Sequence, residues 1–130
     1  IIQANLDLLQ ILKAYDELKQ LGHLEKSKHT IKAAQSLSKW LLENERENSM
    51  IALHQLNSLQ ITKRQRAFTE DEINLLLQLS QNNSDMVRAG AFLLLGKIDV
   101  AQFIIQQFSE DEKTRFMEFP IAIFIKGTNC

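Results

Sequence analysis

Two short acidic runs have the residue types needed for general acid–base chemistry. They are Glu70-Asp71-Glu72 and Glu110-Asp111-Glu112, and paired carboxylates of this kind can donate and accept protons in catalysis. Each run, however, directly follows a hydroxyl residue, Thr69 or Ser109, and ends in a glutamate three positions after it. This spacing is that of a capping box, and acidic side chains also stabilise the positive end of a helix dipole. We therefore interpret both runs as helix starts and not as catalytic pairs.

The other residues that commonly support catalysis or metal binding are scattered. The three histidines, His23, His29 and His54, include no pair at the three- or four-residue spacing that places two ligands on one helical face. Cys130 is the single cysteine, which excludes an internal disulfide and a cysteine zinc site. The four glycines form no phosphate-binding loop, and no serine occupies a Gly-x-Ser-x-Gly turn. We therefore expect no catalytic, cofactor-binding or metal-binding residues. An enzyme with an unrecognised site is the third hypothesis for function, after the two given below.

Lys63, Arg64 and Arg66 form the one tight basic cluster, and they are the candidates for contact with nucleic acid. Three cations can neutralise two or three phosphates, which gives weak affinity without sequence preference. No aromatic residues are interleaved to stack on bases, and the formal net charge of the chain is −1. A solvated connector is the favoured interpretation, and a helical module that contacts nucleic acid through this connector remains the alternative.

The elements that must position these residues are helical. Apolar residues recur at spacings of three and four from Ile1 to Leu18, and Gly22 is placed to end this helix in a left-handed turn. A second helix follows over about 24–42, and so short a joint predicts an antiparallel hairpin. Further helices are expected after caps at Asn48 or Ser49, Thr69, Asn83 or Ser84, Asp99 and Ser109, with a helical or extended segment after Pro120. The fold class is all-α, with about seven helices arranged as antiparallel hairpins.

The two acidic runs lie forty residues apart within near-copies, Phe-Thr-Glu-Asp-Glu and Phe-Ser-Glu-Asp-Glu, and such a period is typical of stacked helix pairs. Between them, Val87-Arg88, Ala91 and Leu95-Gly96 resemble the second helix of a HEAT-type repeat, and Gly96 followed by Ala101 is similar to a tetratricopeptide turn. The resemblance covers about residues 69–108. It implies a short, irregular α-solenoid that serves as a scaffold for other proteins, and it implies no catalytic residues.

We expect one helical domain over 1–130, with N-terminal helices over 1–62 and repeat-like hairpins over 69–126. No apolar run reaches the length that spans a bilayer, and the first residues do not resemble a signal peptide, so a cytoplasmic chain is expected. The chain is interpreted as a fragment, the C-terminal part of a larger regulatory or sensor protein.

The predicted function is a non-enzymatic module that binds protein, either another domain of the same polypeptide or a second copy, with no membrane partner. Trp40 is a candidate interface anchor because tryptophan is enriched at binding hot spots, although its neighbours Leu37 and Leu41 favour a core position. The ends of a helical array leave unpaired faces, so apolar residues there are further candidates. The complete set of possible interface residues is Leu8, Ile11, Trp40, Phe119 and Phe124.

Overall fold

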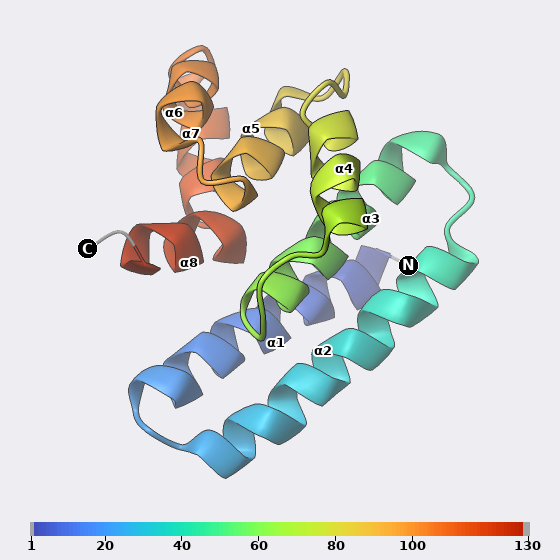
Figure 1. The fold of residues 1–130 in the computed structure, drawn as a ribbon, viewed down its shortest axis with the longest axis vertical. Helices are drawn as coiled ribbons and strands as arrows, with labels where there is room; N and C mark the ends of the chain where they lie inside the picture. The colour runs from blue at the N-terminus through green and yellow to red at the C-terminus, as the bar shows by residue number, and fades with distance from the viewer. Residues whose placement is uncertain (1, 129–130) are drawn as a thin grey trace. The chain divides into compact units, whose positions relative to one another are not determined.

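The computed structural model describes residues 2–128, which form eight α-helices and no strand within that range. The all-α prediction is therefore confirmed, with one helix more than expected because the segment after Pro120 is helical. The helices, labelled in Figure 1, are α1 (Ile2–Gln20), α2 (Leu24–Asn44), α3 (Asn48–Lys63), α4 (Glu70–Leu79), α5 (Asp85–Leu94), α6 (Ile98–Gln106), α7 (Glu110–Met117) and α8 (Pro120–Thr128). Two residues named above, Ile1 and Cys130, lie outside the described part of the chain.

The chain divides into two compact units, Ile1–Ile61 and Thr62–Cys130, which we call unit 1 and unit 2. The boundary falls within α3, so this helix belongs to unit 1 for most of its length and to unit 2 for its last residues.

Unit 1 is built on the antiparallel hairpin of α1 and α2, which lie side by side in Figure 1. Gly22 ends α1 with a φ of 79°, a conformation that residues with a Cβ rarely adopt. The amide of His23 donates to the carbonyl of Leu18 and the amide of Gly22 donates to that of Lys19, which together form a Schellman motif. The apolar stripes of the two helices then meet in one core, which comprises Leu8, Leu12, Tyr15, Ile31, Ala34, Leu41 and Ile61.

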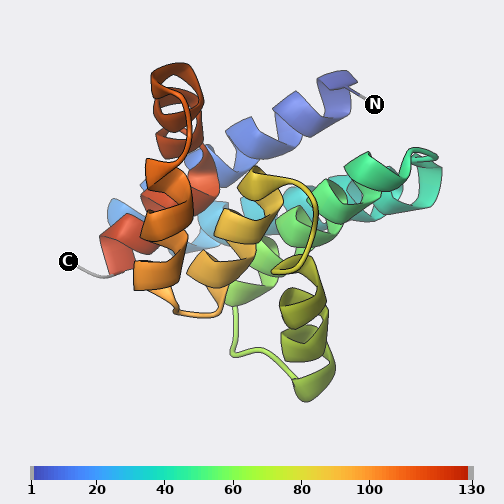
Figure 2. The ribbon, with the colours of Figure 1, turned by 90° about the horizontal axis from the view of Figure 1, so that it is seen from above.

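Unit 2 is organised around α5, which packs against α4, α6 and α8. Figure 2 shows α5 and α6 side by side. The apolar composition of α5 predicted this central place, and all three of its alanine and glycine residues are buried. Gly96 ends the helix with the same φ of 79° and the same pair of Schellman hydrogen bonds as Gly22. Phe116 of α7 is fully buried and makes edge-to-face contacts with Phe108 and Phe119.

Three predicted caps are confirmed and two are wrong. Thr69 and Ser109 form complete capping boxes with Glu72 and Glu112, and the Ser84 hydroxyl accepts from the amide of Val87. By contrast, Asn48 is already the first residue of α3, where the amides of Met50 and Ile51 donate to the Glu47 carbonyl. Asp99 lies inside the first turn of α6, because the chain enters this helix directly from the Gly96 turn through Lys97.

Candidate binding pocket

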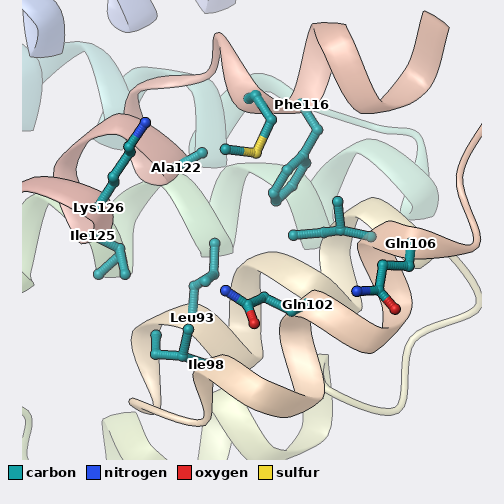
Figure 3. A pocket seen from close by; sticks show the side chains of 10 residues that line it. Leu93, Ile98, Gln102, Gln106, Phe116, Ala122, Ile125 and Lys126 are labelled. Carbon is teal, nitrogen blue, oxygen red and sulfur yellow. The ribbon is translucent and has the colours of Figure 1, made fainter. Parts of the chain in front are cut away.

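Unit 2 contains a pocket of about 600 Å³, which is within the ~300–1,000 Å³ range of ligand sites in proteins. Four helices contribute to its wall, and the lining is mostly apolar. The lining residues are Leu93, Ile98, Gln102, Ile105, Gln106, Phe116, Met117, Ala122, Ile125 and Lys126. In Figure 3 the residues of α5 and α6 lie along one side, and Phe116 with the α8 residues lies along the other.

The spacing of side chains on α6 explains one side of this pocket. Ile98, Gln102, Ile105 and Gln106 are separated by three or four positions, so one helical face carries all four. Ala101 and Ile104 on the adjacent face are buried and hold α6 in unit 2. The same spacing on α8 turns Ala122, Ile125 and Lys126 to the opposite side of the pocket.

Arg64, at the end of α3, fixes the position of α8. Its guanidinium group donates to the carbonyl of Pro120 over 3.5 Å and lies 4.3 Å from the ring centroid of Phe124. The side chain is almost fully buried, so it is a cation–π and hydrogen-bonding contact within unit 2. Two residues predicted for different surfaces, Arg64 for phosphate and Phe124 for a protein partner, therefore contact each other inside the unit.

The other two cations of the basic cluster also have partners within the chain. Arg66 forms a two-point ion pair with Glu72, at 2.7 and 2.8 Å, and this pairing raises the pKa of the guanidinium. The ion pair, together with the Thr69 amide, lowers the pKa of the Glu72 carboxyl to about 2. The Lys63 ammonium lies 5.5 Å from the ring centroid of Phe68. The structure thus gives each of the three cations an intramolecular contact.

The remaining interface candidates occupy different environments. Leu8 is fully buried in the core of unit 1, and Ile11 packs partly buried against that core. Phe119 is partly buried, with its ring centroid 5.9 Å from that of Phe116. Trp40 is 44% exposed, so the preference for a core position is wrong. Successive residues of a helix are rotated by about 100°, and α2 turns Leu41 inward and Trp40 outward.

Unit 1 contains a buried polar pair that the spacing of the histidines did not reveal. Nε2 of His54 lies 2.8 Å from Oε1 of Glu45, and both side chains are nearly inaccessible to solvent. The hydrogen bond from His54 lowers the pKa of Glu45, and the backbone amides of Glu47 and Arg46 act in the same direction against burial. The His54 Nδ1 atom is buried without a hydrogen-bond partner.

Sequence reasoning also missed the pocket, although one signal for it was present. Gln102 and Gln106 are the only polar residues of α6 after Asp99 in its first turn, and they lie four positions apart on the face that also carries Ile98 and Ile105. Such a mixed face is typical of a wall that is neither core nor fully solvated. The depth of the pocket depends on where α7 and α8 return, and local spacing does not predict this.

Within residues 2–128, no group of three or more His, Cys, Asp or Glu side chains is arranged to hold a metal ion. The described helices include none with the length and apolar character needed to cross a bilayer. Comparison with known protein families, with curated proteins and with solved structures found no match to this chain.

Proposed function

We propose that this chain is a non-enzymatic helical interaction module, and that the pocket of unit 2 receives apolar side chains of a partner protein. The observation that carries this proposal is the pocket itself: about 600 Å³, lined mainly by apolar side chains from four helices. Burial of an apolar side chain contributes about 1.5–3 kcal/mol, so two or three partner residues in such a pocket would offset part of the free-energy cost of association.

The composition of the wall supports a peptide ligand. Met117 is half exposed at the pocket, and its flexible thioether side chain adapts to different apolar shapes. Phe116 also belongs to the lining, and because it is fully buried it supports the wall as a rigid aromatic side chain. Gln102 and Gln106 supply amide donors and acceptors for backbone or polar groups of the partner.

The two capping boxes forty residues apart support a wider architectural proposal. We assign α4 to α8 to an irregular α-solenoid of the HEAT type, in which successive helix pairs share a core and present one face to a partner. We also assign the module to the cytoplasm, in line with its lack of reliance on disulfides.

The test is selection of peptides from a displayed random library on the immobilised chain, followed by affinity measurements on a variant with a narrowed pocket. Gln102→Trp places a large side chain at an exposed position of the lining, where the fold is expected to tolerate it. Gln78→Trp is the matched control, because Gln78 is an exposed glutamine of α4 outside the lining.

We expect selected peptides to bind the Gln102→Trp variant on the order of tenfold more weakly or worse, which is typical of losing a central contact, and to bind the control normally. Circular dichroism of both variants checks that the fold is retained. Selected peptides that bind both variants equally, or a selection that enriches no binding peptide, would contradict the proposal.

A further inference from the structure

We draw no further inference here: the strongest candidate, the apolar pocket of unit 2 with Gln102 and Gln106 on its α6 wall, belongs to the site already described, and nothing in the structure shows which kind of partner segment covers it.

Discussion

The two units of this chain build their cores in different ways. Unit 1 relies on two long antiparallel helices of 19 and 21 residues. Their apolar stripes face each other and form a continuous core. Unit 2 uses five helices of 8 to 10 residues, and its pocket lies where four of them meet. Short helices that change direction after two or three turns cannot cover each other along their whole length. The described pocket thus belongs to unit 2, the unit for which we propose a binding role.

The units also differ in the hydrogen bonds that stabilise their helices. Three helices of unit 2 begin with a side-chain cap, two of them complete capping boxes, whereas α2 begins at His23 without a side-chain cap bond. Helices of this length are marginal in isolation, so local capping contributes more to unit 2. Unit 1 contains buried hydrogen bonds between side chains, namely His54 with Glu45 and Asn57 with Gln60.

We expect the largest loss of stability from truncating a buried aliphatic side chain to alanine, and we compare one such change in each unit. Leu12→Ala removes a side chain with no exposed surface from unit 1, and we expect it to lower the free energy of unfolding by about 2–5 kcal/mol. Ile125→Ala should cost less, because one side of Ile125 already faces the pocket and loses fewer contacts. Urea denaturation followed by circular dichroism measures both. A greater loss for Ile125→Ala would show that the pocket wall is packed as tightly as the core of unit 1.

The buried pair of Glu45 and His54 in unit 1 predicts a pH-dependent difference in stability between the natural chain and a Glu45 variant. Because the pKa of Glu45 is lower in the folded state than its ordinary 4.5, the ionised carboxylate stabilises the fold above that ordinary value. This contribution is lost as the pH falls through the lowered folded-state pKa. Glu45→Gln should therefore be less stable than the natural chain near neutral pH, and the difference should diminish in acid. Thermal unfolding at several pH values measures it, and a difference independent of pH would refute the assignment.

Substitutions in the capping boxes should cause smaller losses of stability. The loss should differ between the two boxes, although their sequences are nearly identical. Thr69→Ala and Ser109→Ala should each cost about 1 kcal/mol, because each leaves a first-turn amide without its acceptor. Glu72→Gln should cost more than Glu112→Gln, since Glu72 also pairs with Arg66. The Glu72 contribution is complete above its ordinary pKa of 4.5 and is lost as the pH falls through about 2. Equal costs for the two glutamine variants in urea denaturation would contradict the role of the ion pair.

A stability effect of similar size concerns the attachment of α8. Arg64→Lys keeps the charge but removes the planar group that lies over Phe124, and we expect a loss of about 0.5–2 kcal/mol. The affinity of pocket-binding peptides should also fall, because α8 forms part of the pocket wall. Lys63→Arg, a charge-conserving change at a neighbouring residue outside the lining, is the control. An unchanged affinity for Arg64→Lys would show that α8 is positioned by its apolar contacts alone.

Local sequence signals predicted much of the fold. Gly22, Gly96, Thr69 and Ser109 mark helix ends through backbone conformation and short-range hydrogen bonds, and the structure confirms them. The start of α6 was misplaced because Asp99, a good cap residue, also stabilises a helix from within its first turn.

Local signals of this kind predicted neither the pocket nor the intramolecular contacts of the basic cluster. Arg64 is buried because α8 returns to it from 56 residues further along the chain, and the lining of the pocket likewise combines residues from α5 to α8. Such long-range contacts leave no periodic pattern near the residues they affect. Only the paired glutamines of α6 gave a local indication of a partly solvated wall.

Methyl-resolved nuclear magnetic resonance of the full chain, titrated with a peptide selected on it, tests the central claim most directly. The isoleucine methyl groups of Ile98, Ile105 and Ile125 lie in the pocket lining, and that of Ile31 lies in the core of unit 1. We predict that the first three shift with the bound fraction and that Ile31 does not. Shifts at Ile31 with none in the lining would contradict the claim that the pocket of unit 2 is the binding site.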